Sequence, residues 1–561
     1  MTDLTKLESL AFRLVDLPSL RKLAVEGLQF EYADKPVSKQ NWTDDEKKIV
    51  VESKIIAEKN NFFIYYIQTN TDSLKHWKGI AGKIIKEKNG FCLVCSHNPS
   101  GFKWVFSSLS KEFSRSFSET RHIPIEIIKG HGAPSNFVEF LGKISIGGDS
   151  TATYIASQVS EAFDTFAVEI HNELTSNIFE ALKILSEGII DEKTNNLKLN
   201  DQTLEEIRAP IFTILYRIIF ILYAEDRGIF PIDNKIYHEK FSLKWIKEEW
   251  LLKPPKLVEY EVQKRLKDLF KLIEHGSVAF AYAKEEFSMR SYYGHLFDRE
   301  INSELESWKI SNSALVKTLS YLTRTRDRKG NYFFLDYAAL ETRHLGAVYE
   351  HLLEYHLTVE NKKNLELECQ DKIAELPDPE ERKTSGSYYT PKHVVDDIAQ
   401  RCISPLIDKI IKKNPDKKTQ IEKVLDLKIL DPAMGSGHFI VGAVEYISKR
   451  LCEIEIGEIT EELYIERKRD VVRRCIYGTD LNPLAVDLAS LSLWLETLSS
   501  EKPLSFLQSH LKCGNSLIGS EIESIFSEQS TLFESGKGRN DLQKNIKNFL
   551  ALENLKDDTT S

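Results

Sequence analysis

The sequence predicts an α/β fold in which a parallel sheet near the C-terminal end follows a mostly helical region and an N-terminal region of mixed α and β structure. An apolar run, a glycine turn and a helical periodicity follow one another at 424–451. Apolar residues recur at helical spacing through 150–375, and runs rich in β-branched and aromatic residues occur within 62–128. The expected units are an N-terminal domain at 1–148, a helical domain at 149–375, the sheet-bearing domain at 376–519 and a polar helical tail at 520–561.

The C-terminal sheet is predicted from the stretch Val424 to Ala443. Its apolar run, Val424 to Leu430, has the length of a strand, and Asp431-Pro432 ends it. Gly435-Ser436-Gly437 predicts a sharp turn, after which a helix at Phe439 to Leu451 is expected. This pattern is typical of a nucleotide-binding unit, because glycine lets backbone N–H groups approach a ligand and a helix N-terminus favours negative groups. An ordinary strand-to-helix turn gives the same pattern, so the motif needs support from its neighbours.

Two further strands provide that support. Cys475 to Thr479 is followed by Asp480, and His510 to Cys513 is followed by Gly514-Asn515. Asp480 lies where an acidic residue binds ribose hydroxyls, although it follows Asp431 by more than the usual interval of roughly 20 residues. An inserted helix expected at Glu461 to Arg473 accounts for this longer interval between the two aspartates. A second helix is expected at Leu484 to Leu498. A third should begin near Thr390-Pro391, with Val394, Ile398 and Cys402 as its core stripe.

The two regions before the sheet are predicted in less detail. The helical region should contain a buried helix at Ile211 to Ala224, ended by Gly228, and another at Leu340 to Leu357, with a polar linker at Asn361 to Ser385. The N-terminal region should begin with a helix at 1–20. Its strands are expected at Phe62 to Gln68, Phe91 to Cys95, Lys103 to Phe106 and Ile123 to Ile128.

Composition limits the class of protein. The chain of 561 residues is 42% apolar, and its net charge of −10 argues against a protein whose main surface binds a phosphate backbone. Cys92 and Cys95 form a C-x-x-C within a predicted strand, where residues three apart point to opposite faces, so a metal site there is not expected. The most apolar segment is too short for a membrane span and contains Arg217. We therefore expect a cytoplasmic protein with reduced cysteines and no membrane partner.

One short motif in the N-terminal region has two readings. Glu52-Ser53-Lys54 lies in apolar surroundings, and on a strand Glu52 and Lys54 would share one face. Such a pair, with an upstream aspartate such as Asp44 or Asp45, is how many restriction nucleases hold a metal ion and a water. The tripeptide is also common as a solvated charge pair, which is the expectation we adopt, and no metal ligand is assigned.

The motifs of the C-terminal region together resemble those of the N6-adenine-specific DNA methyltransferases of bacterial restriction–modification systems, especially the long fused methylases of type IIG-like and phage-defence systems. The resemblance implies a Rossmann-like methyltransferase sheet and S-adenosyl-L-methionine as cofactor. It assigns Tyr389, Thr390 and Pro391 to the methionine part of the cofactor, Asp480 to the ribose, Leu481 to the adenine ring and Asn515 to the adenine amino group. The signature D-P-A-x-G-S-G-x-F is matched by Asp431, Pro432, Ala433, Gly435, Ser436, Gly437 and Phe439. The segments Leu345 to Glu350 and Ala224 to Gly228 also resemble segments of these methylases.

One departure from the family limits the expected function. The catalytic tetrapeptide Asn/Asp-Pro-Pro-Tyr/Phe, which holds the flipped adenine, is not found, and the single Pro-Pro of the sequence, Pro254-Pro255, lies within Lys-Pro-Pro-Lys. The family sheet has the order 3-2-1-4-5-7-6, and only its first half is recognised. We therefore expect a C-terminally incomplete methyltransferase with no catalytic residue of its own, inactive alone, which a second polypeptide completes and which contacts double-stranded DNA mainly through the missing half.

Three alternatives remain open at this point. The chain could be a non-catalytic assembly or binding subunit of a defence complex. It could belong to a type IIG enzyme whose N-terminal domain is a nuclease. A methyltransferase of RNA, protein or a small molecule fits less well, because the helical and nuclease-like regions suit a DNA enzyme.

Overall fold

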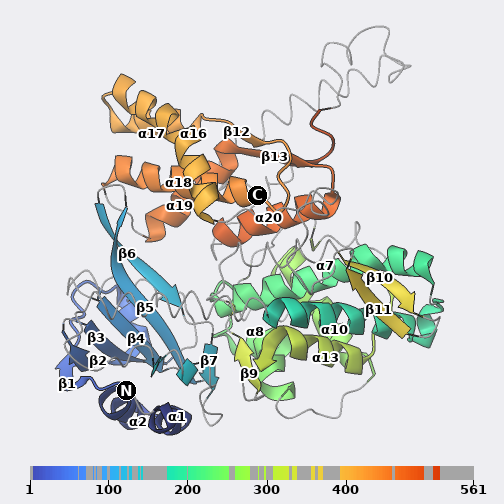
Figure 1. Ribbon diagram of the computed structural model, residues 1–561, viewed down its shortest axis with the longest axis horizontal. Coiled ribbons are helices and arrows are strands. Elements are labelled where there is room, and N and C mark those ends of the chain that lie inside the picture. The colour runs from blue at the N-terminus through green and yellow to red at the C-terminus, as the bar shows by residue number, and fades with distance from the viewer. Residues whose placement is uncertain are drawn as a thin grey trace.

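Three groups of elements form the molecule: an N-terminal sheet, a helical region beside it and a C-terminal α/β region above both (Figure 1). The fold is a mixed α/β arrangement. In this computed structural model the described residues are 4–60, 62–70, 80, 84, 91–97, 101–112, 115–122, 125–128, 137–138, 141–142, 173–198, 200–251, 259–277, 289, 296–297, 307–326, 332–335, 337, 355–360, 364–369, 392–457, 461–497 and 510–517.

The chain begins with two short helices, where a single helix over 1–20 was expected. They are α1 (Leu4–Phe12) and α2 (Leu17–Lys22), and a π-helical turn, η1 (Leu23–Gly27), continues α2. The interruption is explained by Asp16, whose side chain accepts a hydrogen bond from Ser19 N and so begins a new helix. The apolar residues of these helices, Leu7 and Leu20 among them, are buried in the same core as one face of the N-terminal sheet.

Nine strands of the described residues form the N-terminal sheet, in the order β1-β2-β3-β4-β5-β7-β9-β8, with β6 paired to β5. Neighbours are antiparallel except β3 and β4, which are parallel. The strands are β1 (Glu31–Pro36), β2 (Val50–Lys59), β3 (Phe62–Thr69), β4 (Phe91–His97), β5 (Gly101–Glu112), β6 (Arg115–His122), β7 (Ile125–Ile128), β8 (Arg324–Arg326) and β9 (Tyr332–Leu335). The predicted strands in 62–128 are therefore confirmed, whereas β8 and β9 lie in the region expected to be helical.

The helical region is built around α7 (Asp201–Asp226), which contains the buried helix predicted at Ile211 to Ala224. It also contains α8 (Lys235–Lys240), α9 (Leu243–Trp245) continued by the π-helical turn η4 (Ile246–Trp250), α10 (Glu261–His275) and α13 (Asn312–Thr323). The apolar segment, which was expected to be too short for a membrane span, lies in a longer helix. Among the described residues, Glu206–Asp226 of α7 is the one segment long and apolar enough to cross a membrane, and 78% of its apolar window is buried inside the protein. That burial is the pattern of a core helix.

A buried carboxylate, that of Glu225, lies in the last turn of this helix. Glu225 accepts hydrogen bonds from Tyr237 Oη at 2.9 Å, Ser242 Oγ at 3.1 Å, Leu243 N at 3.0 Å and Lys244 N at 2.8 Å. Burial raises the pKa of Glu225 to about 7, and the hydrogen bonds oppose that rise. The carboxylate thus connects the end of α7 to α8 and to the first turn of α9.

A strand hairpin replaces part of the predicted linker. β10 (Tyr355–Glu360) and β11 (Asn364–Cys369) pair as antiparallel strands, so the linker expected at Asn361 to Ser385 is wrong at Asn364–Cys369. Tyr355 to Leu357, expected at the end of a helix, belong to β10. The rest of that predicted helix, with Leu345 to Glu350, lies outside the described residues, as does the predicted tail at 520–561.

The C-terminal region holds a parallel three-stranded sheet in the order β12-β13-β14. The strands are β12 (Ile429–Asp431), β13 (Ile476–Asp480) and β14 (Leu511–Cys513), and the helices are α16 (Lys392–Lys413), α17 (Lys417–Leu425), α18 (His438–Glu455), α19 (Glu461–Cys475) and α20 (Pro483–Thr497). The inserted helix and the second and third strands are confirmed. The first strand is not Val424 to Leu430, because Val424 and Leu425 form the last turn of α17.

The core stripe predicted for α16 is also wrong. Val395, Ala399, Ile403 and Ile407 are buried, whereas Ile398 is 41% exposed and Cys402 is exposed. The true stripe is shifted by one residue and packs on α18, where a Cβ at Gly442 would lie 2.5 Å from Val395 Cγ1.

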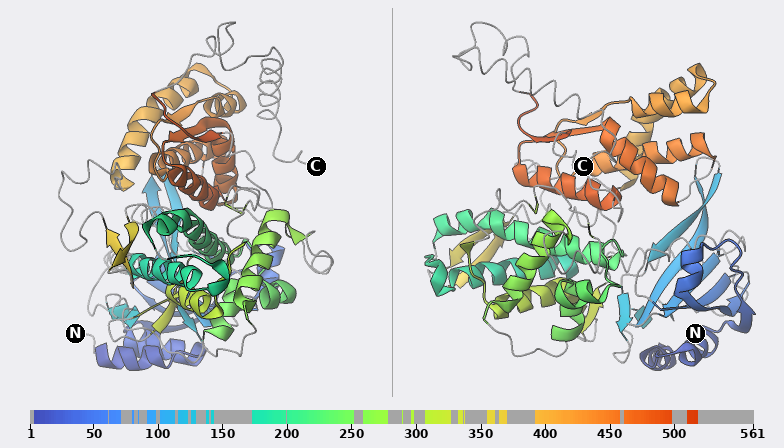
Figure 2. Two further views of the ribbon diagram at one scale, coloured as in Figure 1. Left: turned by 90° about the vertical axis from the view of Figure 1, so that its right-hand side faces the viewer. Right: turned by 180° about the vertical axis from the view of Figure 1, so that it is seen from behind.

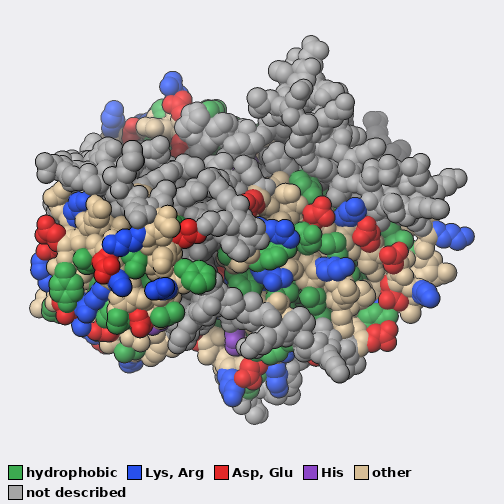
Figure 3. Space-filling view, turned by 60° about the horizontal axis from the view of Figure 1, so that its bottom comes forward, with side chains coloured by type: hydrophobic (Ala, Val, Ile, Leu, Met, Phe, Trp, Pro, Cys, Tyr) green, Lys and Arg blue, Asp and Glu red, His purple; other side chains and the backbone are tan. Residues whose placement is uncertain are grey.

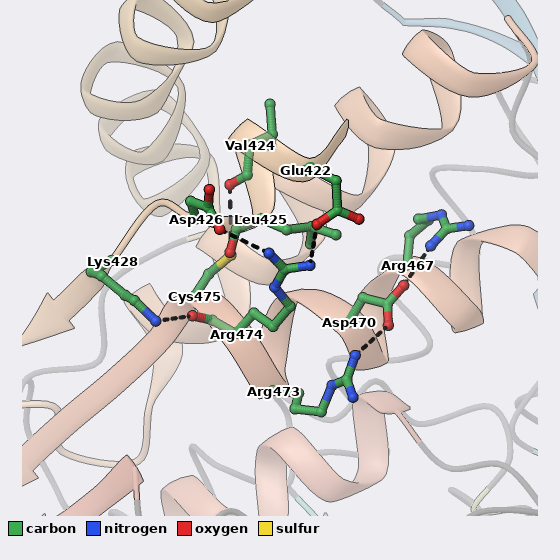
Figure 4. A network of polar contacts seen from close by, with 10 residues as sticks. All are labelled: Glu422, Val424, Leu425, Asp426, Lys428, Arg467, Asp470, Arg473, Arg474 and Cys475. Atoms are coloured by element: carbon green, nitrogen blue, oxygen red, sulfur yellow. Dashed lines mark hydrogen bonds and ion pairs between the residues drawn. The ribbon is translucent and has the colours of Figure 1, made fainter. Parts of the chain in front are cut away.

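Charged side chains join α17, α19 and Lys428, the residue before β12 (Figure 4). Arg474 lies 2.9 Å from Glu422 Oε2 and 2.8 Å from Asp426 Oδ1, and Lys428 Nζ donates to Arg474 O at 2.8 Å. In the same group, Asp470 pairs with Arg467 and Arg473. These contacts fix the end of the sheet opposite the site described below.

The helical and C-terminal regions pack directly on one another (Figure 2). The ring centroids of Phe220 in α7 and Trp494 in α20 are 5.6 Å apart, and both side chains belong to one continuous hydrophobic core. Helix α20 therefore contacts both α7 of the helical region and strands β13 and β14 of the sheet.

Candidate functional site

The candidate site lies where the three parallel strands end. β12 ends at Asp431, β13 ends at Asp480, and β14 is followed by Gly514 and Asn515. Parallel strands have their carboxyl ends at the same edge of a sheet, and Gly514 N donates to Asp480 O at 2.8 Å. The structure thus brings Asp431, Asp480 and Asn515 to one edge from positions far apart in the sequence.

The glycine turn after β12 needs its glycines. Gly435 has φ +53° and Gly437 has φ +86°, a region that favours glycine. A Cβ at Gly437 would also lie 3.1 Å from Ala489 Cβ and 3.2 Å from Ala489 Cα in α20. The turn, defined here as the glycine loop Pro432–Gly437, therefore lies in close contact with α20 before leading into the N-terminus of α18.

Three consecutive residues of β13 fix the glycine loop. Met434 packs over Gly478, where a Cβ would lie 2.3 Å from Met434 Sδ. Thr479 O accepts from Met434 N at 3.0 Å, and Thr479 Oγ1 donates to Pro432 O at 3.1 Å. Asp480 Oδ2 accepts from Gly435 N at 2.9 Å, and its other oxygen accepts from Asn482 N at 2.9 Å.

Two carboxylates give the site its electrostatic character. Burial raises the pKa of Asp431, the hydrogen bond from Ala433 N lowers it, and the charge of nearby Asp480 raises it further. A carboxylate such as Asp431, whose charge is disfavoured by burial and by a neighbouring carboxylate, favours a ligand with positive charge and disfavours the pyrophosphate of a dinucleotide.

The other predicted contact residues differ in exposure. Leu481 is 69% exposed beside Asp480, as a side chain available to a flat ring would be, and Pro432 and Ala433 are exposed. Asn515 is exposed, and its side-chain oxygen accepts from Leu517 N at 2.9 Å. Phe439 is half-buried, and Ser436 is buried with its Oγ 2.9 Å from His438 Nδ1. Tyr389, Thr390 and Pro391 lie outside the described residues.

The charge pair of the N-terminal region has a third member that the sequence did not indicate. Glu52 and Lys54 lie on β2, with Lys54 Nζ 2.8 Å from Glu52 Oε1 and 3.6 Å from Asp34 Oδ1, and the same Asp34 oxygen lies 2.7 Å from Arg21 Nη2. Asp34 belongs to β1 and reaches Lys54 because Pro36 pairs with Lys54 across the two strands. Asp44, one of the aspartates considered from sequence, begins α3 (Asp44–Ile49), and its side chain is 92% exposed and paired with Lys47.

Comparison with known proteins gives a consistent result. Residues 407–521 match the family model described as MmeI, DNA-methyltransferase domain. A putative type II restriction enzyme and methyltransferase of Methanocaldococcus jannaschii is 26% identical over 359 residues, which are 54% of this chain and 27% of that protein. The type II restriction enzyme and methyltransferase Eco57I of Escherichia coli is 28% identical over 33% of this chain and 19% of its own length. The adenine-specific methyltransferase PglX of Streptomyces coelicolor is 28% identical over 26% of this chain and 12% of its own length.

Two solved structures are also similar in part. The type IIL restriction–modification enzyme MmeI in complex with DNA gives a TM-score of 0.37 at 16% identity, over 60% of this chain and 40% of that chain. The DrdV–DNA complex gives a TM-score of 0.30 at 12% identity, over 97% of this chain and 42% of that chain. This chain thus spans about a quarter of the first of these curated relatives and less of the other two. The chain is thus similar in part to methyltransferases of restriction–modification systems, and residues 407–521 are the part that matches the family model of a DNA-methyltransferase domain.

Proposed function

We propose that this chain provides the S-adenosylmethionine-binding half of an adenine-specific DNA methyltransferase of a restriction–modification or phage-defence system. The observation that carries the proposal is the pair Asp431 and Asp480 at the ends of adjacent parallel strands, with the glycine loop between them. The cofactor has a sulfonium and an ammonium, so it fits two carboxylates better than a dinucleotide does. When bound, it supplies an activated methyl group for a nucleophilic nitrogen.

The residues have distinct roles in this proposal. Asp480 accepts from the ribose hydroxyls, and Asp431 accepts from the ammonium. The exposed side chain of Leu481 contacts the adenine ring of the cofactor, and Asn515 binds its amino group. The segment Tyr389–Pro391 is assigned to the methionine part by the resemblance of its sequence alone, and the glycine loop lets backbone groups approach the ligand.

The proposed substrate is adenine in double-stranded DNA, modified in the cytoplasm. On the face shown in Figure 3, basic and acidic side chains of the described residues are interspersed, unlike a basic surface that binds a phosphate backbone. Because the net charge of the chain is −10 and the Asn/Asp-Pro-Pro-Tyr/Phe tetrapeptide is not found in its sequence, we assign most DNA contacts and the tetrapeptide to a second polypeptide or a further segment. Within the described residues β12 pairs on one side only, and Leu430 in it is 60% exposed, as expected of an edge that another strand completes.

Calorimetry tests the cofactor assignment. We expect the chain to bind S-adenosylmethionine and S-adenosylhomocysteine and not NAD⁺, and Asp480→Ala to weaken that binding. Asp397→Ala is the matched control, because Asp397 forms an exposed ion pair with Arg401 on α16. Absence of binding to the wild-type chain would contradict the proposal.

Methyl transfer tests the division of roles. We expect the 561-residue chain to transfer no tritiated methyl group to mixed-sequence DNA without the tetrapeptide. Transfer by the purified chain would show that another group of this chain holds the adenine.

The second candidate function is metal-dependent DNA cleavage by the N-terminal region, and the cluster of Asp34, Glu52 and Lys54 favours it. Two carboxylates beside a lysine on adjacent strands can hold a divalent cation that orients a water for attack on a phosphodiester, and here the cation would replace Arg21, which lies 2.7 Å from Asp34 Oδ1. Hydrogen bonding to Glu52 raises the pKa of Lys54, which keeps its ammonium charged. Sequence reasoning missed Asp34 because only the pairing of β1 with β2 brings it to this place.

Manganese binding tests this second function without needing a recognition sequence. We expect the wild-type chain to bind Mn²⁺, measured by electron paramagnetic resonance, and Glu52→Gln and Asp34→Asn to lose that binding. Asp44→Asn is the matched control, because its carboxylate is exposed and lies in α3. Equal Mn²⁺ binding by all four proteins, or by none, would rule out a metal site here.

A further inference from the structure

Thr479 makes two contacts with the glycine loop, and only one of them depends on its side chain. Its carbonyl accepts from Met434 N at 3.0 Å, a bond that any residue can make. Its hydroxyl donates to Pro432 O at 3.1 Å, which needs a Thr or Ser at this position. The neighbouring residues Gly478 and Asp480 contact the loop at other points, through Met434 Sδ and Gly435 N.

The acceptor of that hydroxyl belongs to a peptide group that also contacts Asp431. The carbonyl of Pro432 and the N–H of Ala433 form one planar peptide unit, so its two ends turn together. At one end Pro432 O accepts from Thr479 Oγ1, and at the other Ala433 N donates to Asp431 Oδ1 at 3.1 Å. The orientation of the Asp431 carboxylate is therefore linked to the hydroxyl of Thr479 through a single rigid group.

We propose that Thr479 is a positioning residue, which orients Asp431 through the Pro432–Ala433 peptide and so determines the affinity for the amino-acid end of the cofactor. The inference rests on the proposed function, and it adds a residue to which no ligand contact is assigned. Without the hydroxyl, the peptide has one side-chain hydrogen bond instead of two and can rotate, so the Asp431 carboxylate is oriented less well towards an ammonium. The ribose and adenine contacts of Asp480 and Leu481 do not pass through this peptide.

The inference predicts a difference between two ligands. S-adenosylhomocysteine contains the amino-acid part, whereas 5′-methylthioadenosine keeps the adenosine and lacks that part. Thr479→Val, which keeps the shape and removes the hydroxyl, should weaken S-adenosylhomocysteine about three- to tenfold, as the loss of one hydrogen bond does. It should leave the affinity for 5′-methylthioadenosine unchanged, and Thr479→Ser should keep the wild-type affinity for both ligands.

Calorimetry with both ligands on the full chain tests this. Thr419→Val is the matched control, because the Thr419 hydroxyl donates to Asp416 Oδ2 at the start of α17, next to the end of α18 opposite the glycine loop. Unchanged affinity of Thr479→Val for S-adenosylhomocysteine, or an equal loss for both ligands, would overturn the inference and leave the proposed function standing. A wild-type chain that binds neither ligand would overturn both.

Discussion

Asp480→Ala is expected to weaken cofactor binding by a factor that can be estimated from the structure. An ionised carboxylate has about four acceptor positions. Two are used by Gly435 N and Asn482 N, each at 2.9 Å, which leaves two for the ribose hydroxyls. Hydrogen bonds to a charged group contribute about 1.5–3 kcal/mol, and each 1.4 kcal/mol is tenfold in affinity, so the loss should be roughly ten- to a hundredfold.

The same substitution also acts on the protein before any ligand arrives. Without the carboxylate, Gly435 N loses its acceptor and the glycine loop loses one of its contacts with β13. Asp480→Asn keeps one acceptor oxygen but turns an N–H₂ group towards a backbone donor, so it should lose less affinity than alanine while disturbing the loop. Hydrogen exchange at Gly435 then separates loop motion from lost ligand contacts.

Calorimetry with S-adenosylmethionine on the wild type, Asp480→Ala, Asp480→Asn and the control Asp397→Ala measures the effect. If the wild type binds S-adenosylmethionine and the affinity of Asp480→Ala is within twofold of the wild-type value, the Asp480 carboxylate does not contact the ribose. The role assigned to Asp480 is then wrong.

Three further predictions concern stability. Because folding raises the pKa of Glu225 to about 7, the free energy of unfolding should fall by about 3 kcal/mol as pH rises from about 4.5 to about 7. Hydrogen exchange at Leu243 and Lys244 should show this pH dependence in the wild type and not in Glu225→Gln. Equal pH dependence in the two proteins would contradict the prediction. Gly442→Ala should lower the free energy of unfolding by about 1–3 kcal/mol in urea denaturation, because the added methyl group clashes with Val395 between α18 and α16. Combining it with Val395→Ala should recover part of that loss, whereas additive losses from the two substitutions would exclude the clash. Amides of Ile429–Asp431 in β12 should exchange faster than those of β3, which pairs on both sides, and equal protection in a monomer would mean that other residues cover the edge.

The candidate site was predictable because its residues lie at fixed places in a repeated pattern. A strand followed by Asp431 and two glycines, and a second strand followed by Asp480, places both carboxylates at one sheet edge without knowledge of any contact. The first strand itself was misplaced, because the run Val424 to Leu430 is too short for periodicity to separate a strand from the last turn of a helix. The run is in fact divided, with Val424 and Leu425 in α17 and Ile429 and Leu430 in β12.

What the sequence did not predict depends on pairing between distant segments. The stripe of α16 was assigned to Ile398 and Cys402 because the helix has apolar residues on two adjacent lines, and only packing against Gly442 selects the line with Val395 and Ala399. Asp34 was missed for a similar reason, since its approach to Lys54 requires the register between β1 and β2.

The order of strands in the N-terminal sheet has a consequence for synthesis on the ribosome. β7, which ends at Ile128, pairs with β9, which begins at Tyr332, so about two hundred residues must be made before the sheet can be completed. Until then β7 presents an unpaired edge in the nascent chain, and such edges favour association with other chains. We expect a chain released before β9 to be recovered mainly in aggregates or bound to chaperones. A chain released after Tyr337 should be recovered mainly without aggregation or bound chaperones.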